Sequence, residues 1–132
     1  MNYFSRQTDY AIQLVSALAK LPGGNLLSLK IFSIESSISF LFLQKIAQSL
    51  KKAKIIASAR GKRGGYRLAR PAESITVRQI MEAAEGRTGM VDCQTIEHQQ
   101  CSKLKKCAIR CPMDKLNEKM LAVLDGATIA DF

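Results

Sequence analysis

Four cysteines are the residues of this sequence whose type and spacing most directly suggest chemistry. Zinc fingers and ribbons usually bring their ligands as close cysteine pairs with two or four intervening residues, and no such pair occurs here. Iron–sulfur clusters are also held by thiolates, and an irregular loop can wrap one without regular pairing. The spacing therefore favours an iron–sulfur cluster, with zinc, metal-free thiol redox chemistry or chemically idle thiols as alternatives. The candidate ligands, separated by seven, five and three residues, are Cys93, Cys101, Cys107 and Cys111.

Basic side chains surround these cysteines. A positive field of this kind stabilises thiolates and would stabilise an anionic cluster. The one histidine, His98, is interpreted as a surface residue of the loop rather than as a ligand. The basic residues concerned are Lys103, Lys105, Lys106 and Arg110.

The rest of the sequence predicts a cytoplasmic protein. No run approaches the roughly 18 apolar residues that a membrane span needs. The N-terminus, with Arg6 and Asp9 early and Gln13 inside its apolar stretch, lacks the layout of a signal peptide. Cytoplasmic cysteines are kept reduced, so the four thiols are expected to be ligands or redox-active groups rather than two structural disulfides. No membrane partner is expected.

Positive charge is concentrated in one segment of the chain. The formal net charge is +9, and residues 51–70 hold eight of the 20 basic residues and no acidic residue. A solvated face is the ordinary explanation of a charge run, but clustering of this degree is the footprint of a surface that binds a polyanion. We therefore expect double-stranded DNA as a partner. The eight residues are Lys51, Lys52, Lys54, Arg60, Lys62, Arg63, Arg67 and Arg70.

The elements that must position these groups are predicted from apolar periodicity. At 132 residues the chain has room for one compact domain with a helical extension. The spacing predicts a first helix, capped by Thr8 or Asp9 and stopped by Pro22. A second helix is expected over 29–35, and a longer third helix, capped by Ser39, is expected to run to about residue 53. Two helices joined by a tight turn, the second leading into the basic segment, are typical of helix-turn-helix proteins.

The basic segment itself predicts a β-hairpin. Its strands are expected over 55–60 and 66–69, joined by a glycine-rich turn over 61–65. Glycines permit positive φ angles and a close approach of the backbone to a ligand. The spacing of a nucleotide-binding Walker loop is absent, whereas Lys62 and Arg63 form a basic tip suited to a DNA groove. A hairpin in this position is the wing of a winged helix.

The remaining chain predicts a fourth helix over 77–85, capped by Thr76, and then no sustained periodicity from 87 to 111. Pro112 suits the first turn of a final helix with an apolar stripe. The stripe could pack on its own domain, but after a long irregular loop in so small a protein we expect it to form a dimer interface. Its members are Leu116, Met120, Val123 and Leu124.

The expected fold is therefore mainly α-helical with a small β-hairpin. Residues 1–86 would form a winged helix-turn-helix DNA-binding domain, 87–111 the cysteine-containing loop, and 112–132 a long C-terminal dimerisation helix with its tail. An enzyme is not expected, because neither a nucleotide-binding motif nor a Ser-His-Asp arrangement is evident.

Several stretches of the sequence resemble the Rrf2 family of bacterial winged-helix regulators. The stretch 6–11 reads RQTDYA, Ile38-Ser39 leads into Leu43, and 58–68 reads SARGKRGGYRL. The tail 124–131, LDGATIAD, also resembles the family's ending. The resemblance covers nearly the whole chain, and its most specific element is the R-G-x-x-G-G-Y wing followed by a downstream cysteine loop.

The resemblance implies a homodimer on a palindromic operator. In such a dimer the third helix enters the major groove, the wing reaches the minor groove, and the long C-terminal helix pairs the subunits. It also implies which side chains contact DNA, and among them Gln44 has an amide that can pair with adenine through two hydrogen bonds. Phe42 could instead belong to the core. The expected DNA-contacting residues are Ser39, Phe42, Gln44, Lys45, Lys51, Arg60, Lys62, Arg63 and Arg67.

Cluster-bearing members of the family use three loop cysteines, which correspond to Cys93, Cys101 and Cys107. This chain departs from the pattern, because seven residues separate the first pair where members commonly have five. The position of a histidine ligand in some members holds Arg110, whose guanidinium stays protonated and cannot bind iron. Cys111 is then the expected fourth ligand. Asp9 is the alternative, since in other members an N-terminal acidic residue of the partner subunit fills this place.

The sequence thus predicts a DNA-binding transcription regulator controlled by an iron–sulfur cluster, with 2Fe–2S favoured over 4Fe–4S. Redox state, oxygen, nitric oxide or iron–sulfur supply could be the signal. The same fold with zinc or thiol-based sensing is one alternative. A small iron–sulfur electron carrier is another, although a carrier would gain nothing from the basic wing.

Overall fold

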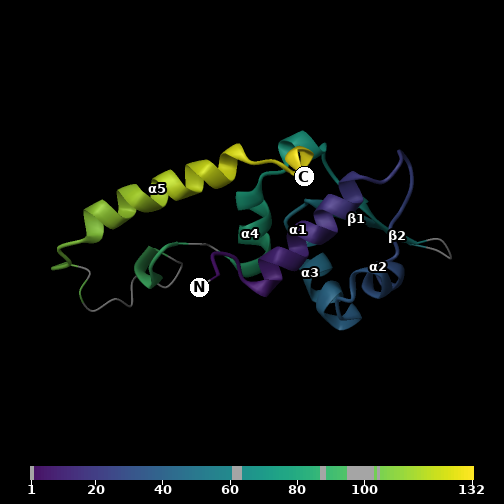
Figure 1. The fold of residues 1–132 in the computed structure, drawn as a ribbon, viewed down its shortest axis with the longest axis horizontal. Helices are drawn as coiled ribbons and strands as arrows, with labels where there is room; N and C mark the ends of the chain where they lie inside the picture. Colours follow the sequence, from purple (N-terminus) through teal and green to yellow (C-terminus); the bar gives the residue numbers. More distant parts are fainter. Residues whose placement is uncertain (1, 61–63, 87–88, 95–102, 104) are drawn as a thin grey trace.

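The fold is described by a computed structural model, which covers residues 2–60, 64–86, 89–94, 103 and 105–132. Within these ranges the chain is mainly helical and holds one two-stranded sheet. Helices α1 to α4 and the hairpin form one body, and α5 projects from it (Figure 1). This arrangement confirms the expected fold class. None of the helices in the described ranges has both the length and the apolar character needed to cross a membrane.

Helix α1 (Arg6–Ala19) starts earlier than expected, because Ser5 is its N-cap and accepts a hydrogen bond from the Thr8 backbone N–H at 3.3 Å. The prediction of Thr8 or Asp9 as the cap is therefore wrong. Thr8 lies inside the first turn and is fully buried, and its hydroxyl donates to the Glu85 carboxylate at the end of α4. Because the Thr8 hydroxyl is buried and bonded to Glu85, it does not cap the helix. Ser5, the nearest suitable residue upstream, does so instead.

Helices α2 (Leu29–Ser36) and α3 (Phe40–Lys52) form the expected helix-turn-helix. Ser37 closes the turn between them in the left-handed conformation, with φ at 59°. The buried stripe of α3 repeats at helical spacing and packs into the core beneath α1 and α4. Its members are Leu43, Ile46, Ala47 and Leu50.

Strands β1 (Ile56–Ala59) and β2 (Gly65–Leu68) pair antiparallel, with Ile56 opposite Leu68. Tyr66 also exchanges two backbone hydrogen bonds of 2.9 Å with Leu27, which ties the hairpin to the segment before α2. At Gly65 a Cβ would lie 2.6 Å from the Leu27 carbonyl oxygen, so only glycine fits there. The wing is therefore held in place beside the helix-turn-helix.

Helix α4 (Val77–Glu85) has the expected bounds and the expected cap. Thr76 accepts from the Gln79 backbone N–H, and the Gln79 side chain accepts from the Thr76 N–H, forming a capping box. Within the described ranges, three short 3-10 helices have no counterpart in the sequence prediction, because single turns carry no periodicity. They are η1 (Ala72–Ser74), η2 (Asp92–Gln94) and η4 (Ile129–Asp131).

Helix α5 (Arg110–Gly126) begins two residues before Pro112, and its described residues include no buried side chain. Its C-terminal end is fastened to the body. The Val77 backbone N–H donates to the Ala127 carbonyl at 2.9 Å, and the Arg78 guanidinium donates to the Asp125 carboxylate at 2.8 Å. Beyond the helix, Ile129 enters the core with 1% of its surface exposed. The N-terminal end of α5, which holds Cys111, therefore lies far from these C-terminal contacts (Figure 1).

Candidate DNA-binding surface and cysteine site

The outer side of α3 lies next to the wing, as a recognition helix requires. Ser39 and Lys45 are exposed, and Gln44 is half-buried. Gln44 lines a groove of about 260 Å³ together with Lys30 of α2 and Gly64 of the wing. Gln44, the residue expected to read a base, therefore lies in the same groove as residues of α2 and of the wing, which would also contact a duplex.

Phe42 has a contact inside the protein. Its ring packs edge-on against Tyr10 of α1, with ring centroids 5.4 Å apart and an interplanar angle of 84°. The side chain is half-buried and lies against the core cluster. Edge-to-face aromatic pairs stabilise a fold beyond the area they bury. Phe42 therefore packs within the protein. The DNA contact expected of it stays a prediction.

Two residues of this surface escaped the sequence analysis. Lys30 is exposed at the N-terminal end of α2, outside the basic segment that drew attention to the wing. Leu41, in the first turn of α3, is an aliphatic residue with 73% of its surface exposed. Exposure of an apolar side chain on a recognition helix suits contact with a thymine methyl group. The signal for Leu41 was available in the sequence, because it lies outside the buried stripe of α3.

The basic residues of the hairpin divide between described and undescribed positions. Lys51 at the end of α3, Arg60 after β1 and Arg67 in β2 are exposed. Lys62 and Arg63, expected at the tip of the wing, lie outside the described residues. Contacts from these exposed cations to phosphates would position a duplex without reading its sequence.

The four cysteines do not form a complete site within the described ranges. Cys93 in η2 and Cys107 before α5 are half-buried, and Cys111 is exposed in the first turn of α5. Cys101 lies outside the described residues. Among the residues that the structure describes, no group of three histidine, cysteine or acidic side chains is placed to hold a metal ion. Ligation by these cysteines is therefore a proposal.

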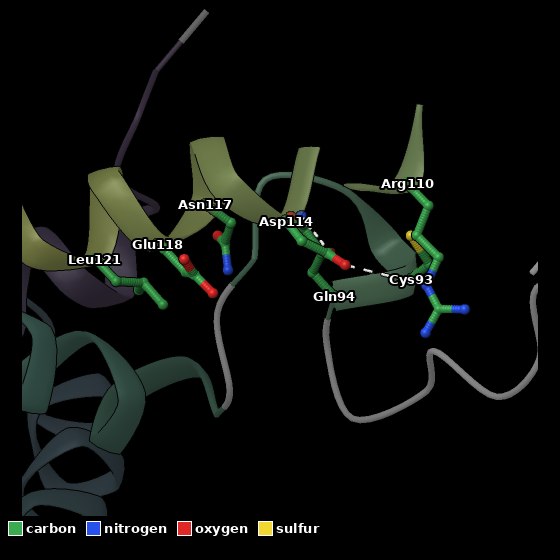
Figure 2. Close-up of a pocket in the computed structure, with 7 residues that line it drawn as sticks. All are labelled: Cys93, Gln94, Arg110, Asp114, Asn117, Glu118 and Leu121. Atoms are coloured by element: carbon green, nitrogen blue, oxygen red, sulfur yellow. Dashed lines mark hydrogen bonds and ion pairs between the residues drawn. The ribbon is translucent and has the colours of Figure 1, made fainter. Parts of the chain in front are cut away.

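Cys93 faces α5 across a cavity of about 350 Å³ (Figure 2). The other wall of the cavity is one face of α5, and Arg110 projects from its first turn toward Cys93. The Arg110 Nε lies 4.0 Å from the Asp114 carboxylate. The residues lining the cavity are Cys93, Gln94, Arg110, Asp114, Asn117, Glu118 and Leu121.

Asp9, the alternative fourth ligand, lies elsewhere in the same chain. It is exposed in the first turn of α1, and its carboxylate accepts a hydrogen bond of 3.3 Å from Gln13. It lines a different cavity from the one that Cys93 lines. The structure therefore gives Asp9 a hydrogen-bond partner on its own helix and does not bring it to the cavity of Cys93.

A helix-turn-helix, a hairpin wing and a projecting C-terminal helix define a winged-helix DNA-binding protein. Residues 4–132 match the family described as Rrf2, iron-dependent transcriptional regulator, and the chain belongs to that family. It is therefore a DNA-binding transcription regulator.

Individual relatives extend over most of the chain. The protein aau3 of Rhizobium meliloti is 31% identical over 96% of this chain and 82% of its own length. The HTH-type transcriptional regulator NsrR of Geobacillus kaustophilus is 30% identical over 94% of this chain and 84% of its own.

Two solved structures share the fold. The structure of CymR, the global cysteine regulator of B. subtilis, covers 99% of this chain and 95% of its own, with a TM-score of 0.77 and 26% identity. The structure of T. potens IscR covers 98% of this chain and 85% of its own, with a TM-score of 0.76 and 28% identity. Because the two matches cover 99% and 98% of this chain, they extend over α5.

Proposed function

We propose that this regulator is a homodimer that binds a palindromic operator and senses through an iron–sulfur cluster held by Cys93, Cys101 and Cys107, with Cys111 as fourth ligand. The observation that carries the proposal is the position of Cys93 against the first turns of α5. The other end of the same helix is fastened to the DNA-binding body by Asp125 and Ala127. A structural change at the cysteines would therefore move the N-terminal end of α5, and α5 would transmit the movement to α4, which its C-terminal end contacts.

The residues present suit an iron–sulfur cluster by their chemistry. Cys93, Cys107 and Cys111 are free thiols, which are the donors that hold such clusters. Exposed Lys103, Lys105 and Lys106 supply positive charge near an anionic group. When bound, a cluster would supply one-electron and ligand-exchange chemistry. Protein purified without oxygen is expected to absorb visible light and to contain iron and sulfide, whereas a zinc or thiol sensor would do neither.

The exposed stripe of α5 supports the homodimer. Leu116, Met120 and Val123 are exposed by 42%, 37% and 68%, and they recur at helical spacing. The helix projects from the body, so its own domain does not cover them (Figure 1). Pairing of two such helices would remove these side chains from water and would set the separation of the two recognition helices.

For base recognition, we expect Gln44→Ala to flatten the base preference at one position of each operator half-site. A two-point amide–adenine contact gives about 1–3 kcal/mol of discrimination. The measurement is a competition binding assay with duplexes changed at each position in turn. Gln13→Ala, the same substitution on an exposed position of α1, should leave every preference unchanged. Intact discrimination in Gln44→Ala at all positions would show that this residue does not read the operator.

A further inference from the structure

The side chain of Gln94 connects the turn that carries Cys93 to helix α5. On the side of the turn, its Oε1 accepts hydrogen bonds from the backbone N–H groups of Met90 at 2.9 Å and Val91 at 3.3 Å. These bonds close the backbone of 90–94 around the amide. Cys93 is the residue directly before Gln94, so its position depends on the orientation of the Gln94 side chain.

On the side of the helix, the same amide is the donor. The Gln94 Nε2 donates to the Met113 carbonyl oxygen at 2.8 Å and to the Asp114 Oδ1 at 3.2 Å. The second Asp114 oxygen faces Arg110, the first residue of α5 (Figure 2). The Gln94 amide therefore donates to acceptors in the first turns of α5 and accepts from donors in the turn. Glutamine can do both because its side chain carries an NH₂ donor and a carbonyl acceptor.

The backbone is also shaped to admit Gln94. A Cβ built on Gly89 would lie 2.5 Å from the Gln94 Cβ and 3.0 Å from its carbonyl carbon. No real side chain tolerates such a separation, so the turn closes this tightly only because residue 89 is glycine. This close approach is independent of the four hydrogen bonds and places Gln94 in the same position.

We propose that Gln94 is a positioning residue that holds the Cys93 thiol against the first turns of α5 and couples the movement of one to the other. Its role as part of a sensor rests on the proposed function, in which Cys93 is a ligand. Its role in positioning Cys93 does not, because the hydrogen bonds belong to the chain alone. The two parts can be tested separately.

The test uses the full-length protein without metal and the nearly isosteric substitution Gln94→Glu. A carboxylate can still accept from Met90 and Val91, but it cannot donate to Met113, and it places a negative charge beside Asp114. We expect amide hydrogen exchange in residues 110–117 and the alkylation rate of Cys93 by iodoacetamide to rise about threefold to tenfold, as for the loss of one or two hydrogen bonds. Both are measured by peptide mass spectrometry.

Four further variants make the result specific. Gln48→Glu makes the same charge change on an exposed residue of α3 and should leave both rates unchanged. Combining Gln94→Glu with Asp114→Asn restores a donor opposite the new carboxylate and should return the rates toward wild type. Gly89→Ala should act like Gln94→Glu, whereas Gly23→Ala, whose Cβ would meet nothing within 4 Å, should have no effect.

Wild-type exchange and alkylation rates in both Gln94→Glu and Gly89→Ala would overturn the positioning role. Coupling to the sensor is read from reconstitution with ferrous iron and sulfide without oxygen, where Gln94→Glu should release iron to a chelator faster than wild type. A wild-type protein that takes up no iron would instead overturn the proposed function, and the exchange and alkylation results would still decide the positioning role.

Discussion

Alanine at Cys93, Cys101 or Cys107 is expected to abolish stable iron–sulfur binding in protein purified or reconstituted without oxygen. Each thiolate removed leaves an iron without a ligand from the chain, so iron and sulfide should fall to background and visible absorption should disappear. Cys111→Ala is expected to leave a labile cluster, because a fourth ligand decides how firmly the other three hold it. The measurements are iron and sulfide content and the absorption spectrum of each variant.

The fourth position is decided by comparing Cys111→Ala with Asp9→Ala. If Cys111 is the ligand, the Asp9 variant keeps its full spectrum and the Cys111 variant loses its cluster quickly in air. A Cys111 variant identical to wild type, beside an Asp9 variant without iron, would assign the fourth position to Asp9 of a partner subunit.

Glutamate at Val123 is expected to convert the dimer to monomers and to remove most of the operator affinity. A charged side chain at this position would have to be buried without a partner between two α5 helices. Two linked recognition helices bind about 10²- to 10⁴-fold more tightly than one, so affinity should fall by a factor of that order. Sedimentation velocity reports the dimer, and a fluorescence anisotropy titration reports operator binding.

The control is Ala122→Glu, which adds the same charge to an exposed residue of α5 outside the apolar stripe. It should leave both the sedimentation coefficient and the operator affinity at their wild-type values. A Val123→Glu protein that stays dimeric would show that the stripe Leu116, Met120 and Val123 is not the interface.

The sequence was a reliable guide wherever local chemistry decides the structure. Helix α4 has the predicted bounds because Thr76 and Gln79 form a capping box within four residues. The turn between α2 and α3 and the hairpin were predicted for the same reason, since turn residues and short-range periodicity specify them. Family membership was also predicted, from the wing motif together with the cysteine loop, and it is confirmed.

Other features depend on residues far apart in the chain. The cap of α1 was misplaced because the burial of Thr8 depends on Glu85, a partner 77 positions away. Docking of Ile129 in the core depends on its hydrogen bond to Ile75, and a single turn of helix offers no pattern to recognise. The two hydrogen bonds that Gln94 donates, to Met113 and Asp114, likewise require α5 to fold back over the turn. Such contacts arise from packing, which a single sequence does not display.

The most direct test of the central claim is operator affinity measured on one preparation in two states. Protein purified without oxygen is titrated with a palindromic operator duplex at fixed salt, first with its iron and sulfide in place and then after removal of iron by a chelator. We predict that the two dissociation constants differ by at least about tenfold, a coupling of roughly 1.4 kcal/mol or more. Equal affinities in the two states, with the loss of iron verified, would contradict it.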